Sequence, residues 1–356
     1  MLPSPPRQWP HPGRLNIPGY PANGPTEKWS VRVAVLLVLT LVTVVTHQGM
    51  PHDAGPPPPA TPVPSVGPPV DASQIASAED EDPVSIVTDD PTCPEWEPIT
   101  AALNTALGNG WHQRDPSVPQ TEWTDDQHTQ YRAVAVAMRA AADKSVALAK
   151  QTPHRVMREL YEQAIAYWRA YADSVDDYRP SADHLAGAAT SAAESIQSIC
   201  AAIDFGAAGA RAALVLPGPP PVPEGPLADP GRPPRFITGP SAFCSEWVTM
   251  VNEYGTATRE WRDRHDPNLP ASQSPPDLRE LNAKAATVMQ QNADRTQLLG
   301  LLSGNLTAAD FAALSSHYRR AYAMALPSYG LPDTHLDDAA SRLQSLTDHA
   351  CRAVRK

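Results

Sequence analysis

The feature that most constrains this chain is an internal duplication marked by its four cysteines. Cys93 and Cys200 are 107 residues apart, and so are Cys244 and Cys351. A shift of the first segment by 151 positions onto the second needs no gap. It aligns further identical residues: Glu95 with Glu246, Trp96 with Trp247, Asp115 with Asp266, Tyr178 with Tyr329 and His184 with His335. Duplication of one domain is the economical explanation for such a period.

Apolar residues within each copy recur at helical spacing. Tyr131, Val134 and Met138, for example, follow one another at steps of three and four, which is typical of one face of a helix. We expect four helices per copy, the first spanning about 94–107. The expected start and stop signals are Thr124, Thr152 with Pro153, and Ser181 in the first copy, and Ser274 with Pro275, Gly304, Thr307 with Asp310, and Pro332 in the second.

Four helices joined by short loops predict an up-down-up-down bundle in which the first and fourth helices are neighbours. Cys93 and Cys200 then lie at the same end of the first bundle, as do Cys244 and Cys351 in the second. Two disulfides are therefore expected, each stabilising its bundle by about 4 to 5 kcal/mol in the chain-entropy model. Zinc binding is the alternative, but no close pair such as C-x-x-C supports it. The predicted fold class is all-α, with two tandem disulfide-closed four-helix bundles.

The 41 prolines divide the chain into domains and linkers because they concentrate outside the two alanine-rich copies. The acidic, proline-rich linker before the first bundle is predicted to be an extended, disordered stalk, and the second linker should let the bundles reorient independently. Trp111 and Trp123 are expected to cover apolar surface of the first bundle. The predicted boundaries are 1–28, a disordered cytoplasmic segment; 29–46, a transmembrane signal anchor; 47–92, the first linker; 93–203, the first bundle; 204–241, the second linker; and 242–356, the second bundle.

An apolar stretch from Trp29 to Thr46 is just long enough to cross a bilayer as a helix. Basic residues dominate before it and acidic residues after it, so the positive-inside rule places the amino terminus in the cytoplasm and the rest outside. A cleaved signal peptide is the rival interpretation of this segment. In both cases most of the chain is exported, and we expect it at the plasma membrane.

The net charge of −11 and the lack of a basic cluster exclude nucleic acid as a partner. The expected partners are the membrane itself and a protein or wall component of the cell envelope. The oligomeric state does not follow from the sequence.

Two segments carry a resemblance to known proteins. Residues 114–119 read RDPSVP and residues 147–155 read ALAKQTPHR. The chain resembles uncharacterised proline-rich single-pass membrane proteins of mycobacteria and related actinobacteria. That resemblance implies a cell-envelope location and no activity.

Repeated polar residues are the candidate binding groups. Tyr167, Arg169 and Tyr171 place two tyrosines one helical turn apart with an arginine at an angle to them. They could line a groove that binds an anion, or the tyrosines could pack in the core while the arginine pairs with a carboxylate such as Glu95 or Glu246. His184 could be a ligand or a surface capping residue. The equivalent set in the second copy is Tyr318, Arg320, Tyr322 and His335.

No catalytic signature is present, since the sequence contains neither a G-x-S-x-G motif nor a phosphate-binding loop and its cysteines are assigned to disulfides. We therefore predict no catalytic residue, no metal site, no cofactor and no enzymatic activity. The expected function is a membrane-anchored extracytoplasmic interaction or scaffolding protein of the cell envelope. The alternative is an extracytoplasmic sensor or carrier that binds an apolar or aromatic small ligand inside the bundles.

Overall fold

The computed structural model describes residues 71–218 and 227–355, all of which belong to one compact unit. In these residues the secondary structure is entirely helical, with ten α-helices and several short 3-10 turns. The predicted cytoplasmic segment, the anchor at 29–46 and the linker up to residue 70 lie outside the described residues. Within the described ranges, no helix is both long and apolar enough to span a membrane.

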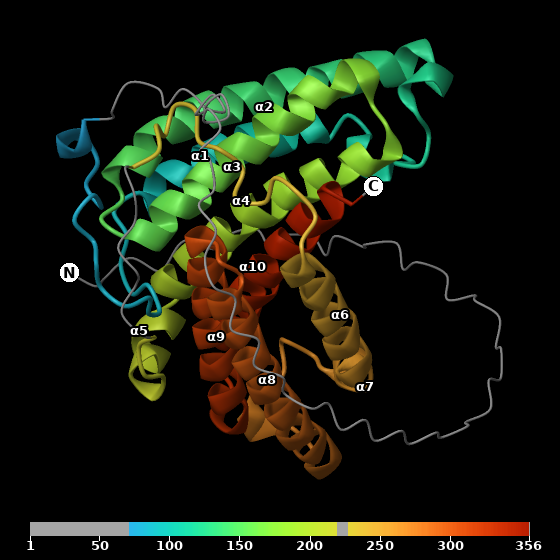
Figure 1. Ribbon diagram of the computed structural model, residues 1–356. Helices are drawn as coiled ribbons and strands as arrows, with labels where there is room; N and C mark the ends of the chain where they lie inside the picture. Colours follow the sequence, from blue (N-terminus) through green and yellow to red (C-terminus); the bar gives the residue numbers. More distant parts are fainter. Residues whose placement is uncertain (1–70, 219–226, 356) are drawn as a thin grey trace, which may run out of the picture. The chain divides into compact units, whose positions relative to one another are not determined.

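The first copy contains four helices, each of which packs against the next along the chain (Figure 1). The first helix also contacts the fourth. The Cys93–Cys200 disulfide joins those two, with an S–S distance of 2.03 Å, as the cysteine spacing predicted. Trp111 and Trp123, in the connection after the first helix, are buried as expected. The helices are α1 (Cys93–Leu107), α2 (Asp125–Gln151), α3 (Arg155–Ser174) and α4 (Asp183–Asp204).

The second copy repeats this order after the short helix α5 (Ala207–Arg211). Its first helix is divided in two, and that helix again contacts the last one. The Cys244–Cys351 disulfide, with an S–S distance of 2.02 Å, joins the first and last helices of this copy. The helices are α6 (Ala242–Ala257), α7 (Arg259–Arg264), α8 (Pro276–Leu302), α9 (Leu306–Ala325) and α10 (Thr334–Ala353).

Two of the predicted helix signals are confirmed. Thr124 caps α2 in a reciprocal capping box with Gln127. Gly304 follows the end of α8 with a φ of +66°, a left-handed conformation that glycine adopts without strain.

Other predicted caps were wrong by a few residues. Thr152 ends α2 instead of opening α3, because its hydroxyl donates to the Asp90 carboxylate at 2.6 Å. The cap of α9 is Asn305, whose side chain accepts from the backbone N–H of Ala308 at 2.9 Å. Ser181 lies inside a 3-10 turn before α4, Ser274 precedes α8 by two positions so that Pro276 is its first residue, and Thr307 and Asp310 lie within α9.

The two copies are not independent, because α4 and α10 form the most extensive helix pair in the described part of the chain. The pair is antiparallel: His184 at the start of α4 meets His349 near the end of α10, at 3.5 Å between their Nδ1 atoms. Further along, Glu194 and Arg342 form an ion pair at 2.8 Å. The expectation that the bundles reorient independently was wrong, since α4 and α10 pack against each other over much of their length.

The described part of the first linker, residues 71–92, is ordered and not the disordered stalk that we expected. Ile75, Val84, Ile86 and Val87 are buried in it. The Val87 carbonyl accepts a hydrogen bond from Tyr318 of the second copy, at 3.4 Å. The buried apolar side chains hold this acidic segment against the helices. The prediction of disorder considered its proline and acidic content and not these apolar residues.

The described part of the second linker, which precedes the second copy, contacts the first copy. Phe236 packs its ring between Tyr167 of α3 and Phe311 of α9, with centroid distances of 6.2 and 5.4 Å. Gln163 of α3 accepts from the Phe236 N–H at 3.0 Å and donates to the Pro234 carbonyl at 3.1 Å. Each copy is therefore contacted by the segment that precedes the other copy.

Candidate interaction surface

The tyrosines predicted as binding groups in the first copy lie in the core. Tyr167 and Tyr171 are fully buried, and burial raises the pKa of both phenols. Trp111 donates its indole N–H to the Tyr171 hydroxyl at 3.3 Å. Arg169 turns outward, where it pairs with Asp143 at 2.8 Å and donates to the Gly231 carbonyl. These three residues do not line a common groove.

The equivalent residues of the second copy follow the same pattern. Tyr318 and Tyr322 are buried, and the Tyr322 hydroxyl lies 3.2 Å from Nε2 of His265. Arg320 pairs with Asp294 at 2.8 Å, the residue equivalent to Asp143. The carboxylates that the arginines meet are thus these aspartates of α2 and α8, and not Glu95 and Glu246. The partner of each arginine depends on which residues of the neighbouring helix face it, and the sequence alone does not show this.

The two candidate histidines occupy different surroundings. His184 faces His349 across the α4–α10 contact, whereas His335 stacks on Phe205 with a centroid distance of 5.1 Å. Burial lowers the pKa of His184 and of His335, so both imidazoles are held toward the neutral form. Across the ranges that the structure describes, no group of three or more His, Cys, Asp or Glu residues could hold a metal ion.

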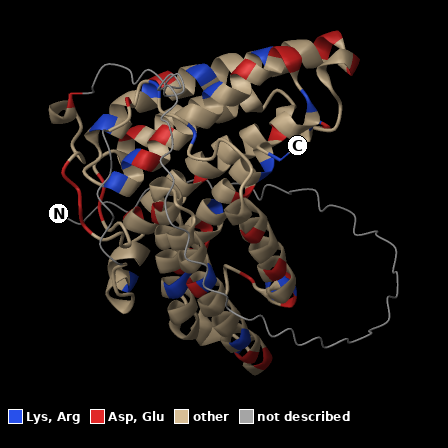
Figure 2. Cartoon of the chain, viewed as in Figure 1, with Lys and Arg blue, Asp and Glu red and all other residues tan. Residues whose placement is uncertain are grey.

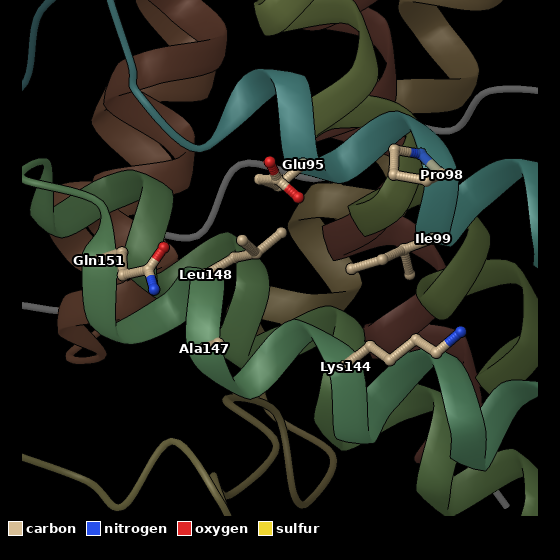
Figure 3. Close-up of a pocket in the computed structure, with 7 residues that line it drawn as sticks. All are labelled: Glu95, Pro98, Ile99, Lys144, Ala147, Leu148 and Gln151. Carbon is tan, nitrogen blue, oxygen red and sulfur yellow. The ribbon is translucent and has the colours of Figure 1, made fainter.

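A groove of about 570 Å³ opens between α1 and α2 of the first copy (Figure 3). Ile99 of α1 and Leu148 of α2 form its apolar floor. Glu95 and Lys144 add one charge of each sign. The remaining lining residues are Pro98, Ala147 and Gln151.

The second copy differs at the equivalent place. Glu246 and Arg295 keep the two charges, but they approach to 3.9 Å, and Arg295 also pairs with Glu253. Leu298 and Leu302 replace Ala147 and Gln151, and both leucines are exposed. The same fold therefore carries two different surfaces: a groove in the first copy and exposed leucines in the second.

Sequence reasoning missed this surface because it looked for residues that the two copies share. The useful signal was the opposite one: positions where the gap-free alignment replaces a small or polar residue by leucine. The groove offers hydrophobic contact and one charge of each sign, and its seven lining residues include no nucleophile with a neighbouring base.

Charged residues of both signs are distributed over the helices of the described part of the chain (Figure 2). In the view of Figure 2, Lys and Arg are interspersed with Asp and Glu along the helices instead of gathering into a basic face.

Comparison with known proteins supplies the family. The chain is 41% identical over 331 residues to an uncharacterised protein of Mycolicibacterium smegmatis, an alignment that covers 92% of this chain and 86% of that protein. This agrees with the mycobacterial resemblance seen in the sequence. No solved structure matches the chain. A family model described as mycobacterial ESX-1 associated protein matches residues 75–355, nearly the whole described part, and the chain belongs to that family.

Proposed function

We propose that this protein is a non-catalytic interaction module that acts with the ESX-1 secretion system at the mycobacterial cell envelope. The family match over residues 75–355 is the observation that carries the proposal. The groove between α1 and α2 supports it, since its lining is suited to binding and contains no catalytic pair. A protein that serves a secretion system by binding needs a stable scaffold with an accessible apolar surface, and this fold provides both.

We further propose that residues 29–46 anchor the chain in the plasma membrane and that the disulfide-bonded unit lies outside the cytoplasm. The two disulfides favour this placement, because such bonds persist in oxidising compartments and are rare in the cytosol. The basic residues before the apolar stretch and the acidic residues after it favour the same orientation.

We also infer that each disulfide-closed set of helices descends from one duplicated four-helix bundle. The matched cysteine separations of 107 residues and the repeated contact order support this inference. The antiparallel packing of α4 on α10 then resembles the interface of a dimer fused into one chain.

The binding role can be tested by closing the groove. Ala147→Arg places a long charged side chain on its rim, and we expect loss of the proteins that co-purify with the tagged full chain from mycobacterial envelope extracts. Val136→Arg is the matched control, because Val136 is exposed on the same helix three turns away and does not line the groove. An unchanged set of co-purified proteins with Ala147→Arg would rule out the groove as the binding surface.

The placement can be tested separately. All four cysteines are paired, so a single added cysteine is a clean label site. Val136→Cys should react with a membrane-impermeant maleimide in intact cells, whereas Ser4→Cys, before the apolar stretch, should react only after lysis. The reverse pattern would contradict the proposed orientation.

The alternative of a sensor or carrier with a ligand inside the bundles stays a prediction. Buried aromatic rings occupy the interior positions that such a ligand would need: Trp96 stacks on Trp168 with a centroid distance of 5.9 Å. Tyr161 packs edge-on against the same Trp96 at 5.3 Å. The structure thus gives this alternative less support than the open groove gives to protein binding.

A further inference from the structure

The hairpin between α8 and α9 presents an exposed leucine patch. Leu298, Leu301, Leu302 and Leu306 are between 39% and 73% exposed, although they lie within nine residues of one another. From Thr296 to Ala309 no residue carries a charge. We call these four leucines and the loop that joins them the leucine tip.

The first copy shows that the fold does not require this composition. At the positions equivalent to the four leucines it has Ala147, Lys150, Gln151 and Arg155. The preceding segment contacts the hairpin in both copies: the Ala76 N–H donates to the Lys150 carbonyl at 2.8 Å, and Asn305 donates to the Phe236 carbonyl at 2.7 Å. The two equivalent hairpins therefore differ in composition: one carries Lys150 and Arg155, and the other is uncharged with four exposed leucines.

The leucine tip lies beside the segment through which the chain enters the described unit. Arg155 donates to the Asp80 carbonyl at 2.6 Å and pairs with Asp310 at 2.7 Å. Asp80 belongs to the entering segment, and Asp310 lies one helical turn after Leu306. One arginine side chain therefore bridges the entering segment and the start of α9.

The chain outside the described residues is long enough to bring this end to a membrane. Residues 47–70 separate the proposed anchor from the first described residue and can span at most about 80 Å. An exposed apolar patch marks a site of interaction with a protein or a membrane. The run from Thr296 to Ala309 carries no charge, so its leucines can enter the edge of the hydrocarbon layer, where charged side chains are costly.

We propose that the leucine tip inserts into the surface of the lipid bilayer that anchors this chain. This rests on the proposed anchoring by residues 29–46, and it adds a second point of membrane contact. A single tether would leave the disulfide-bonded unit free to rotate relative to the membrane. A second contact would orient it, with the α8–α9 hairpin toward the lipid. The leucines enter as apolar side chains on a short uncharged hairpin, as in other interfacial elements.

The test uses the full chain reconstituted into vesicles of phosphatidylcholine and phosphatidylglycerol. Leu302→Cys is labelled with an environment-sensitive fluorophore, and part of the lipid carries brominated acyl chains that quench it on contact. Gln151→Cys is the matched control, since it occupies the equivalent place in the first copy and is also exposed. Both labelled chains carry the same anchor, so a difference between them reports the tip.

We expect a blue shift and strong quenching by brominated lipid at position 302, and neither change at position 151. Leu301→Glu in the Leu302→Cys chain should abolish the quenching while circular dichroism shows an unchanged helical content. A chain that floats with the vesicles but shows no quenching at 302, or equal quenching at 151, overturns the tip insertion and leaves the anchor intact. A chain that does not float overturns both. A blue shift without quenching by brominated lipid would mean that another part of the protein or a second copy covers the tip, which also overturns the proposal.

Discussion

The contact between α8 and α9 gives a sharp prediction at Gly300. A Cβ atom added there would lie 2.3 Å from the Cβ of Ala312 and 3.3 Å from the Cα of Ala309. Carbon atoms in contact are normally about 3.5 to 4.0 Å apart, so the two helices must separate by more than 1 Å. Neither atom belongs to a flexible side chain that could move away. The substitution Gly300→Ala is therefore an overpacking mutation.

The magnitude follows from two opposing effects. Alanine is favoured over glycine in a helix interior by about 1 kcal/mol. Overpacking of a close-packed core costs about 1 to 3 kcal/mol, and the severity of this overlap places it near the upper end. The net effect on the free energy of unfolding should be a loss of about 2 kcal/mol.

The assay is urea unfolding of the full chain in mild detergent, followed by tryptophan fluorescence. Gly255→Ala is the matched control, because it lies in α6 and its added Cβ would meet only Arg262, at 3.9 Å. That control should be neutral or slightly stabilising. Adding Ala312→Gly to Gly300→Ala should recover part of the loss by removing the opposing methyl group. If Gly300→Ala stabilises the protein as much as Gly255→Ala does, the close approach of α8 and α9 is wrong.

Two further predictions concern buried polar groups. Arg155→Ala should lower the free energy of unfolding by about 3 to 5 kcal/mol, because it leaves the Asp310 carboxylate without this buried partner. Arg132→Ala, which removes only an exposed pairing with Asp176, should change it by less than about 1 kcal/mol, and equal losses in the same urea assay would refute the argument. Burial lowers the pKa of His317 from 6.5 to about 4, so the folded state binds its proton less readily than the unfolded chain. Its contribution to stability is present above pH 6.5 and is lost as the pH falls toward 4, by about 3 kcal/mol. His317→Gln should flatten the pH dependence of the urea midpoint between pH 7 and pH 4; an unchanged slope would show that His317 is not the group responsible.

The candidate site was only partly accessible to sequence reasoning. The repeated tyrosines and arginines drew attention because both copies share them, but a shared residue in a duplicated domain mostly serves the shared fold. Tyr171 and Tyr322 illustrate this, since both are buried in the core. The groove and the leucine tip lie where the copies differ, at pairs such as Gln151 and Leu302. The sequence signal for both surfaces is a change of polarity between aligned positions of the two copies.

The sequence by itself determined the repeat at an offset of 151 positions, the pairing of the cysteines and the helical faces. Those features depend on local periodicity and on a spacing that any four-helix arrangement must respect. Thr124 and Gly304, for instance, act through the backbone within a few residues of themselves. Such signals are readable because their physical cause is local.

Only the tertiary structure decided how the two copies pack together. Apolar periodicity shows that a face is buried but not which surface covers it. The buried residues of α4, between Ala186 and Ala202, lie on more than one side of the helix. The reason is that α10 packs on α4 in addition to the helices of the first copy. The ordered segments before each copy follow the same rule, because Val87 and Phe236 each contact a tyrosine of the other copy, Tyr318 and Tyr167. Packing between segments distant in sequence depends on shape and solvent exclusion, which no local pattern records.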